Sequence, residues 1–464
     1  MKVYWFLIYG LIFTGSLAGQ SFYFGNDLSY VNEMEDCGVV YKENTTPKDP
    51  YRIFADHGGN LVRLRLWKDP SWYKTLNSGK LYSDFNDVAR SIKRAHQHNM
   101  DVLLDFHLSD NWADPAKQLV PLAWEPVVNN LPVLKDSLYR YIYSTLFELN
   151  QRSLLPEMVQ IGNETNKGIL LSPSDNLKFT LDWTRNTVLF NAAIQAVRDI
   201  EKLTKKTIRI GIHAAGPKDT GWLIDQFIQH GVTDFDVIGI SYYWAWHKPS
   251  SIQETGALIK SLKSKYAKEV MIFETGYIWT TASQDQANNI ISETHPDYSP
   301  VSPGNQKKWL IDLTREVLKS NGSGVIYWEP AWVSSDCFTQ WGKGSHQEHA
   351  TFFDFRQNLI DTGGIQWMSY DYNSTVSLQT HSSKLEVTIR VDTPSQQLRI
   401  WIKDPGVEIN VVHIYDLKGS RVYSVVPYRD GESYTIPFPP LPHGLYIAEA
   451  RDKKHKWYRQ KFGF

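Results

Sequence analysis

The sequence predicts an α/β protein, a (β/α)8 TIM barrel followed by a small all-β sandwich. Three observations lead to this prediction. The chain has 464 residues, which is too long for one ordinary domain. Eight strand-like runs alternate with helical patterns in roughly the first three quarters of the chain. After Trp367 the helical patterns stop, and short strands separated by turn residues take over.

The eight expected strands of the barrel are short apolar runs spread over about residues 22–355. They are Phe22–Gly25, Asn60–Leu66, Asp101–Phe106, Met158–Ile161, Ile208–Ile212, Val237–Ser241, Val270–Phe273 and Gly324–Trp328. A doubly wound open sheet is the alternative for such a pattern. Eight units in about 330 residues favour the closed barrel.

Amphipathic helices are expected between several of these runs. In one, Val88, Ile92 and Ala95 recur at helical spacing after Ser83, which we expect to cap the helix. Another covers Phe190–Val197. Such alternation of strand and helix is typical of parallel barrels.

The C-terminal region is predicted to be an all-β unit. Leu385–Val391 alternates strictly between apolar and polar residues, as a half-buried strand does. Five further short strands are expected at Leu398–Ile402, Val411–Tyr415, Arg421–Val425, Ser433–Ile436 and Gly444–Ala448.

The N-terminus has the pattern of a secretory signal peptide. Lys2 precedes an apolar run from Val3 to Leu17, which is too short to span a membrane, and small residues follow. We expect cleavage after Ala18 or Gly19, and no membrane span elsewhere. The expected organisation is a signal peptide at 1–18, a catalytic barrel at 19–368 and a β-sandwich at 369–464. The protein is then secreted, to the extracellular space or a bacterial cell surface.

The composition suits a neutral polymeric ligand. The net charge is −1, from 49 basic and 50 acidic residues, so nothing attracts a polyanion and a nucleic-acid partner is not expected. Aromatic residues make up 13%, with 17 Trp and 25 Tyr. Their flat apolar faces and polar edges suit stacking on sugar rings.

Two glutamates close predicted strands, at the barrel end where active sites of this architecture lie. Glu164 follows the run Met158–Ile161, and Glu274 follows Val270–Phe273. Burying a carboxylate there costs free energy, so such a residue is expected to be paired or hydrogen-bonded or to have a functional role. Glycosidic cleavage needs two carboxyl groups, a proton donor and a nucleophile. The alternative for either residue is a salt-bridge or capping role.

Further polar and aromatic residues stand at strand ends and are candidates for the same site. Arg63 and Arg65 alternate within one strand and therefore share a face. The other strand-end candidates are His107, His213, Tyr242, Tyr243 and Trp328.

No cofactor is expected to be required. The sequence has no HExxH, CxxC or phosphate-loop motif. Oxygen ligands in the stretch with Asp285, Asn288, Asn289 and Asp297 suit a structural calcium ion, which we do not place; a solvated polar loop is the alternative.

Across about residues 22–365 the chain resembles glycoside hydrolase family 53, the arabinogalactan endo-β-1,4-galactanases. The matching segments follow in order through all eight units, and the longest, Leu103–Pro115, is highly specific. The others are Gly25–Ser29, Val62–Trp67, Gln160–Glu164, Gly239–Tyr243, Phe273–Tyr277 and Tyr327–Trp332.

The resemblance implies a retaining double displacement on β-1,4-galactan, including the (arabino)galactan side chains of pectin. Glu164 matches the general acid/base and Glu274 the nucleophile. The resemblance also implies that Asn163 binds the 2-hydroxyl of the sugar, and that Arg65 and Tyr242 orient Glu274 and keep it ionised. Trp328 matches the platform beneath the reacting sugar.

The expected substrate-binding set also includes residues next to these segments. It comprises Asn163, Arg65, His107, Asp110, Trp112, His213, Tyr242, Tyr243, Trp328 and Trp332, with Trp244 and Trp246 as candidates for further subsites. The family often has proline after the second tyrosine, where this chain has Trp244. That departure concerns the subsites and not the chemistry.

Two other functions stay open. A related barrel could act on mannan or another β-1,4-glycan with the same two glutamates. A non-catalytic glycan-binding surface protein is the second alternative, and the presence of both Glu164 and Glu274 argues against it.

Two features lie outside the catalytic pattern. Cys37 follows the first strand and Cys337 the last, and these strands are neighbours in a closed barrel, so we expect a disulfide; free buried thiols are the alternative. In the tail, His413–Gly419, Leu441–Ile447 and the ending Lys461-Phe462 resemble a type IX secretion sorting domain. A sandwich that only packs on the barrel, or a carbohydrate-binding module, are the alternatives there.

Overall fold

The computed structural model describes residues 22–178 and 181–372, and most of the C-terminal strands. In that region the described ranges are 387–392, 397–402, 408–416, 421–430, 433–437, 445–453 and 457–463. The chain divides into two compact units between Tyr370 and Asp371. The expected signal peptide lies outside the described residues. Within the described ranges, no helix is both long and apolar enough to cross a membrane.

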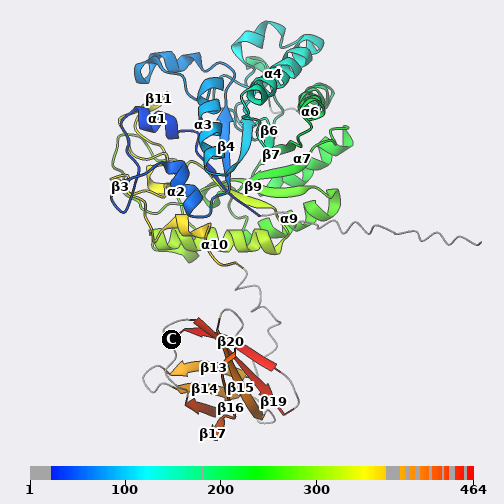
Figure 1. Ribbon diagram of the computed structural model, residues 1–464. Coiled ribbons are helices and arrows are strands. Elements are labelled where there is room, and N and C mark those ends of the chain that lie inside the picture. The colour runs from blue at the N-terminus through cyan, green and yellow to red at the C-terminus, as the bar shows by residue number, and fades with distance from the viewer. Residues whose placement is uncertain are drawn as a thin grey trace, which may run out of the picture. The chain divides into compact units, whose positions relative to one another are not determined.

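The first unit is a closed barrel of eight parallel strands, so the (β/α)8 prediction is confirmed and the open-sheet alternative is wrong (Figure 1). Around the barrel the order is β1-β10-β9-β8-β7-β6-β5-β4. The strands are β1 (Tyr23–Asp27), β4 (Leu61–Leu66), β5 (Asp101–Phe106), β6 (Met158–Ile161), β7 (Arg209–Ala215), β8 (Val237–Ser241), β9 (Glu269–Thr275) and β10 (Gly324–Tyr327).

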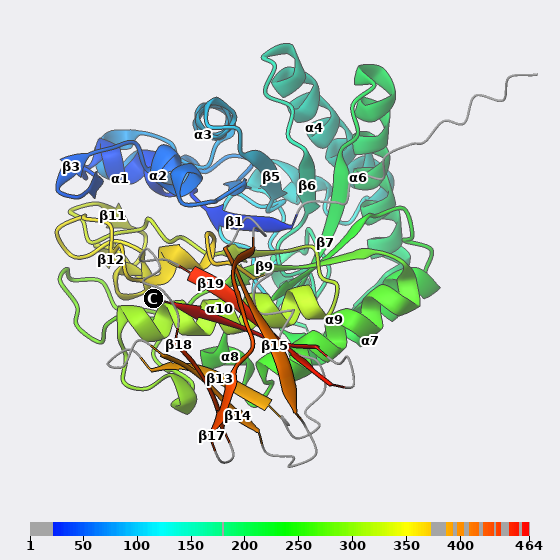
Figure 2. The same ribbon diagram turned by 60° about the horizontal axis from the view of Figure 1, so that its bottom comes forward.

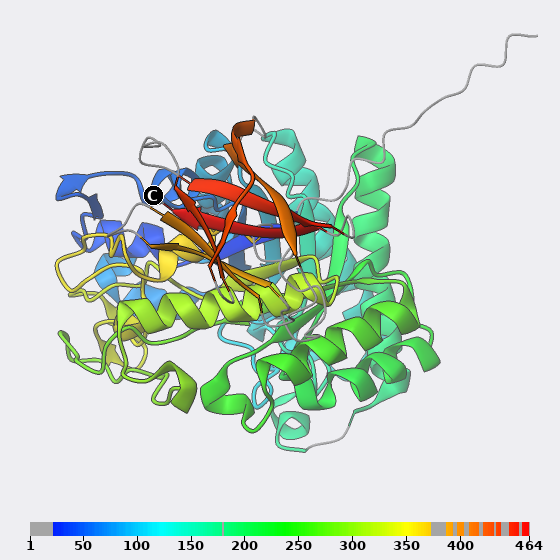
Figure 3. The ribbon, with the colours of Figure 1, turned by 90° about the horizontal axis from the view of Figure 1, so that it is seen from below.

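Helices form the outer layer around these strands (Figures 2 and 3). They are α1 (Val31–Asp36), α2 (Pro50–Asp56), α3 (Phe85–Gln97), α4 (Leu131–Gln151), α5 (Pro173–Asn176), α6 (Trp183–Thr204), α7 (Pro217–Gln229), α8 (Trp244–His247), α9 (Ile252–Tyr266) and α10 (Pro303–Lys319). Two short hairpins, β2 (Lys42–Glu43) with β3 (Thr46–Pro47) and β11 (Phe338–Thr339) with β12 (Gly342–Lys343), lie in the loops.

The expected cap of α3 was wrong by one residue. Asp84 is the N-cap, and its carboxylate accepts the Asp87 N–H at 2.9 Å. Ser83 has a positive φ of 54°, and its own N–H donates to the carboxylate of Asp87 at 2.8 Å. A carboxylate caps as well as a hydroxyl does, and it also favours the positive end of the helix dipole.

The lower interior of the barrel is filled by apolar side chains from seven of the eight strands, two of them from β9 and none from β7. The cluster is Tyr23, Leu61, Leu103, Met158, Val237, Met271, Phe273 and Ile326. The ring of Phe273 needs the space over Gly239, where a Cβ atom would lie 2.0 Å from the ring. This packed layer closes the barrel beneath the strand ends, so a ligand can enter only from above.

Strand β9 contains one residue more than the strands beside it at Phe273 and Glu274. The register with β8 passes from Ile240–Ile272 to Ser241–Glu274, and the register with β10 shifts at the same place. Successive residues of a regular strand point to opposite faces, and a bulge re-aims a side chain. The bulge therefore lets Phe273 fill the core while Glu274 also faces the barrel interior.

The second unit consists of two four-stranded antiparallel sheets. One is β13 (Val387–Asp392), β14 (Gln397–Ile402), β18 (Ser433–Pro437) and β17 (Tyr428–Asp430); the other is β16 (Arg421–Val425), β15 (Ile409–Asp416), β19 (Leu445–Asp452) and β20 (Trp457–Gly463). The two sheets share a buried cluster that includes Ile400, Ile436, Val412 and Ala448. This is an all-β sandwich, as predicted, although β17 and β20 were missed. Parts of both tail motifs, at 417–419 and 441–444, lie outside the described residues.

Cys37 and Cys337 form a disulfide with their Cα atoms 5.6 Å apart, so the free-thiol alternative is wrong. The bond joins the segment after α1 to the start of the β11–β12 hairpin. A crosslink between residues this far apart in the sequence restricts the unfolded chain strongly.

We expect loss of this disulfide to lower the free energy of unfolding by about 2–4 kcal/mol. The measurement is guanidinium unfolding of the wild type and of Cys37→Ala/Cys337→Ala, followed by tryptophan fluorescence. Dithiothreitol should lower the unfolding midpoint of the wild type to that of the variant. It should leave the midpoint of the variant unchanged. Equal midpoints with and without reductant would contradict this prediction.

Candidate active site

A cavity of about 530 Å³ opens at the C-terminal ends of the barrel strands, between loops that follow several of them. It contains two carboxyl groups and a set of aromatic rings. The lining residues are Trp112, Ala113, Asp114, Asn163, Glu164, Tyr243, Trp246, Glu274, Asn288, Asn289, Ile290, Trp328, Trp332, Trp341 and His346. The structure thus brings Glu164 and Glu274, 110 residues apart in the sequence, into one cavity.

Glu164 stands in a tight turn just after β6. Its own φ is +46°, in the left-handed region that favours glycine, and Gly162 before it has φ +74°. A non-glycine residue in this conformation costs about 1 kcal/mol or more and tends to occur at functional sites. The side chain is hydrogen-bonded to Ser241. Burial, together with the nearby negative charge of Glu274, raises the pKa of Glu164 to about 8.

Glu274 is held by a cation and a hydroxyl group. Arg63 Nη1 lies 2.9 Å from its Oε1, and the Tyr243 hydroxyl donates to its Oε2 at 3.1 Å. Burial raises the pKa of Glu274 to about 7, whereas the Arg63 charge and the Tyr243 hydrogen bond oppose that rise. Because Arg63 and Tyr243 contact Glu274, this carboxyl group ionises more readily than that of Glu164.

Arg63 is the centre of a buried charge network. Besides Glu274 it pairs with Asp27 at 2.8 Å and with Asp105 at 2.7 Å, and it donates to Asn163 Oδ1 at 2.8 Å. Although burial opposes ionisation, Arg63 and then His107 hold the pKa of Asp105 below its usual value. The guanidinium thus has a fixed position from which it stabilises the charge of Glu274.

The expectation that Arg65 and Tyr242 hold Glu274 was wrong. Arg65 faces the interior as expected, but two residues along a strand correspond to about 7 Å, and its partner is Glu329 at 3.2 Å. The Tyr242 hydroxyl donates to the Ser250 carbonyl at 2.8 Å, and its ring stacks on Trp309 of α10. Consecutive side chains after a strand diverge, so only Tyr243 turns into the cavity.

Asn163 lines the cavity beside Glu164, and its amide is held on both sides. Oδ1 accepts from Arg63 Nη2 and from Gln160 Nε2 at 3.1 Å, and Nδ2 donates to the Ala113 carbonyl at 2.8 Å. These contacts fix the orientation of the amide. Its role toward a sugar hydroxyl stays a prediction.

His213 and His107 do not line the cavity and support residues that do. His213 is fully buried, with Nε2 2.9 Å from Ser241 Oγ, which in turn contacts Glu164. His107 Nδ1 accepts from the Ala113 N–H at 3.3 Å, and so its protonated Nε2 donates to Asp105 at 3.1 Å. Burial lowers the pKa of both histidines, which favours their neutral forms.

Asp110 is also a supporting residue and not a cavity residue. Its carboxylate accepts the backbone N–H of Asp69 at 3.0 Å and of Leu122 at 2.8 Å, which ties two loops together. Ser241 was missed by the sequence reasoning, as was Gln160. Their positions at or near the ends of predicted strands were the available signal.

The cavity walls are aromatic. Trp112 and Trp328 meet edge to face at 6.2 Å, and Trp332 packs against Trp328 at 6.1 Å. Trp246 is 49% exposed and Trp341 is 59% exposed. Trp341, on the β11–β12 hairpin, was missed by the sequence reasoning, whereas Trp244 packs on His295 and does not line the cavity.

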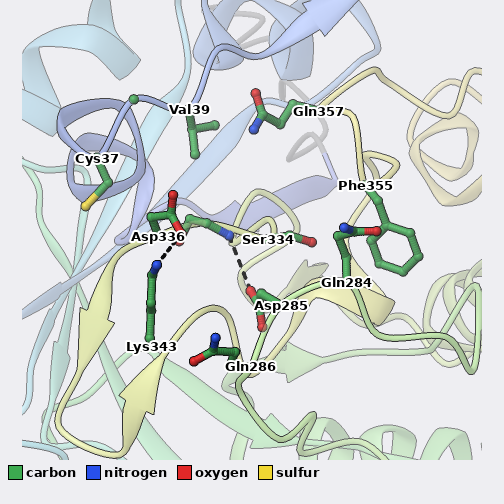
Figure 4. A pocket seen from close by; sticks show the side chains of 12 residues that line it. Cys37, Val39, Gln284, Asp285, Gln286, Ser334, Asp336, Lys343, Phe355 and Gln357 are labelled. Carbon is green, nitrogen blue, oxygen red and sulfur yellow. Dashed lines mark hydrogen bonds and ion pairs between the residues drawn. The ribbon is translucent and has the colours of Figure 1, made fainter.

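Carboxylates tie the long loop after β9 to the loop after β10. Asp285 accepts the N–H group of Ser335 at 3.3 Å (Figure 4) and that of Ser345 at 2.7 Å, both of which follow β10. Glu348 accepts the N–H of Gln284 at 2.9 Å and also binds Ser334. A second cavity, of about 380 Å³, lies behind this loop and is lined in part by Asp285.

The four residues considered for calcium do not converge. The Asp285 carboxylate is taken up by backbone donors, Asn288 and Asn289 line the first cavity, and Asp297 lies 3.8 Å from His295. In the described part of the chain, no group of three or more His, Cys, Asp or Glu residues could hold a metal ion.

Comparisons with known proteins agree with this geometry. The model of glycosyl hydrolase family 53 matches residues 23–363. The chain is 45% identical over 368 residues to the arabinogalactan endo-β-1,4-galactanase of Cellvibrio japonicus, covering 79% of this chain and 95% of that protein. It is 33% identical to the endo-β-1,4-galactanase of Bacillus subtilis, covering 68% of this chain and 71% of that protein.

A solved structure gives the same result. The GH53 catalytic domain of Ignisphaera aggregans superposes with a TM-score of 0.66 at 31% identity, covering 75% of this chain and 96% of that domain. The matched share of this chain corresponds in extent to the barrel unit that carries the cavity.

Proposed function

Because this chain belongs to glycosyl hydrolase family 53 and is therefore a glycoside hydrolase, we propose that it is an endo-β-1,4-galactanase. It cleaves β-1,4-galactosidic bonds inside galactan and arabinogalactan, including the side chains of pectin. The observation that carries this proposal is the placement of Glu164 and Glu274 in one cavity, with a cation beside Glu274 only. The names of the similar proteins support the choice of polymer.

The proposed reaction is a double displacement. Glu274, kept ionised by Arg63 and Tyr243, attacks the anomeric carbon while protonated Glu164 donates its proton to the departing oxygen. The glycosyl–enzyme bond is then broken by water, from which Glu164 removes a proton. The elevated pKa of Glu164 suits both steps, because the group has to give and take a proton near neutral pH.

Substrate preference decides between the proposal and its alternative. Purified protein is incubated with potato galactan, mannan and carboxymethylcellulose, and the products are separated by chain length. We expect a series of galacto-oligosaccharides from galactan at early times, and no products from the other two polymers. Release of manno-oligosaccharides would favour a hydrolase that acts on mannan. No release from any polymer would favour a non-catalytic glycan-binding protein.

The pH dependence of kcat/KM is expected to be bell-shaped, and Tyr243→Phe should move only one side of it. The Tyr243 hydroxyl favours ionised Glu274, so its removal raises the pKa of Glu274. The reaction needs ionised Glu274, and the acidic limb should therefore shift to higher pH. The alkaline limb, set by Glu164, should stay in place. An acidic limb that stays unchanged in Tyr243→Phe would contradict the assignment of Glu274.

We also propose that the protein is exported. The signal-peptide pattern at 1–18 supports secretion, and the resemblance of the tail to a type IX sorting domain supports delivery to or through the outer membrane of a bacterium. N-terminal sequencing of the exported protein, and secretion of a reporter fused to residues 369–464, test the two steps separately.

A further inference from the structure

Arg65 lies directly behind the aromatic wall of the cavity and has no contact with Glu164 or Glu274 among its described interactions. It is 2% exposed, and its guanidinium carbon lies 4.1 Å from the centre of the Trp112 ring. The rings of Trp67 at 4.6 Å and Tyr30 at 4.8 Å surround the same group. Only Trp112 of these three rings lines the cavity.

The partner of Arg65 connects this aromatic cage to the other tryptophans of the cavity wall. Glu329 is fully buried and follows Trp328 directly in the chain; its Oε1 lies 3.2 Å from Arg65 Nη1. Its Oε2 accepts the Tyr30 N–H at 3.3 Å, and the Tyr30 ring stacks on Trp332 at 3.9 Å. The ion pair is therefore linked, directly or through one residue, to Trp112, Trp328 and Trp332, and Trp328 contacts both of the other rings.

Stability alone gives little reason for this arrangement. A buried ion pair gains little over apolar side chains of the same size, because both charges lose their hydration. Among the described residues, Arg65 makes one ion pair, at 3.2 Å, and its Nε has no hydrogen-bond partner. A cation over an aromatic face does, however, fix where that ring lies.

We propose that Arg65 and Glu329 are positioning residues that hold Trp112 edge to face against Trp328, so that the two rings form one fixed wall for the bound sugar. This inference rests on the proposed function, since it assigns a role in substrate binding and not in bond cleavage. It differs from the role first expected for Arg65, because Arg63 already accounts for the orientation of Glu274.

The test is a set of kinetic measurements on galactan with Arg65→Met, Arg65→Lys, Glu329→Gln and Trp112→Ala. We expect Arg65→Met to raise KM about tenfold while kcat falls less than about threefold, because only ring placement is lost. Arg65→Lys restores a cation and should recover part of the loss. Glu329→Gln, which keeps the shape of the side chain, should raise KM in the same direction.

A double-mutant cycle separates positioning from general destabilisation. If Arg65 acts through Trp112, Arg65→Met in the Trp112→Ala background should raise KM by less than about twofold. Arg94→Met is the matched control: Arg94 also lies over a buried ring, Tyr51 at 4.5 Å, and is paired with Glu35, but it belongs to α3. That variant should lower the melting temperature and leave KM unchanged.

A readout without substrate keeps the test independent of the galactanase assignment. Near-ultraviolet circular dichroism should lose the same tryptophan band in Arg65→Met as in Trp112→Ala, and Arg94→Met should retain it. The proposal would be overturned if the KM increase of the double variant equalled the product of the two single-variant increases. An unchanged tryptophan band in Arg65→Met would also overturn it. A wild type that leaves galactan intact would remove the proposed function, while the spectra would still decide the role of Arg65.

Discussion

Replacing Glu274 with glutamine is expected to lower kcat on galactan on the order of 10⁴-fold, because the amide cannot form the glycosyl–enzyme bond. The shape of the side chain is kept, and the hydrogen bond from Tyr243 can still be accepted by the amide oxygen. Galactan binding should persist, since the tryptophan walls are untouched. The measurement is reducing-sugar release, together with affinity electrophoresis in a gel that contains galactan.

Glu269→Gln on the same strand is the matched control. Glu269 lies at the opposite end of β9, is partly exposed and pairs with Arg209 at 3.2 Å, far from the cavity in strand position. This variant should keep near wild-type activity with a small loss of stability. If Glu274→Gln retained more than a few per cent of wild-type turnover, Glu274 would not be the nucleophile.

The barrel itself could be predicted from the sequence because its signal is repeated eight times. Each strand is a short apolar run buried on both faces, which stands out from the amphipathic helices around it. The two glutamates could also be placed, since both follow such runs and active sites lie at that end of the barrel. The disulfide followed from barrel closure, because Cys37 and Cys337 come after the first and last strands.

The partners of Glu274 could not be derived in the same way. Periodicity places Arg63 and Arg65 on the same face but does not give their heights relative to β9, and the bulge at Phe273–Glu274 changes that register. At the bulge, the Phe273 ring packs over Gly239, a residue distant in the sequence. A preference for Arg63 over Arg65 therefore required the three-dimensional structure.

The loops were the least predictable part of the site. Trp341 reaches the cavity because the hairpin that carries it is fixed by the disulfide and by Asn77, which exchanges two hydrogen bonds with the backbone of Phe338 at 2.7 and 2.8 Å. No local sequence pattern predicts such contacts between loops that are distant in the sequence. Similarly, the acidic loop considered for calcium turned out to use Asp285 as an acceptor for backbone N–H groups.

Replacing Glu164 with glutamine should produce a different deficit from the loss of Glu274. The amide can neither donate the proton to the leaving oxygen nor activate water, and general acid–base catalysis typically contributes about 10²–10⁴-fold. We therefore expect kcat on galactan to fall by about 10³-fold. The contacts of Arg63 and Tyr243 with Glu274 remain, so the nucleophile is still in place.

This difference can be measured with leaving groups of different acidity. A dinitrophenyl galactobioside needs no proton at departure, so Glu164→Gln should form the glycosyl–enzyme rapidly and then stall, which gives a burst of dinitrophenol. Azide, a small nucleophile that needs no general base, should release the stalled enzyme and restore turnover. The rate should also lose its alkaline limb, because the group with the raised pKa is gone. An equal loss of rate on galactan and on the activated substrate, without a burst or azide rescue, would show that Glu164 is not the acid/base. Glu274→Gln is the comparison, and it should give neither a burst nor azide rescue on either substrate.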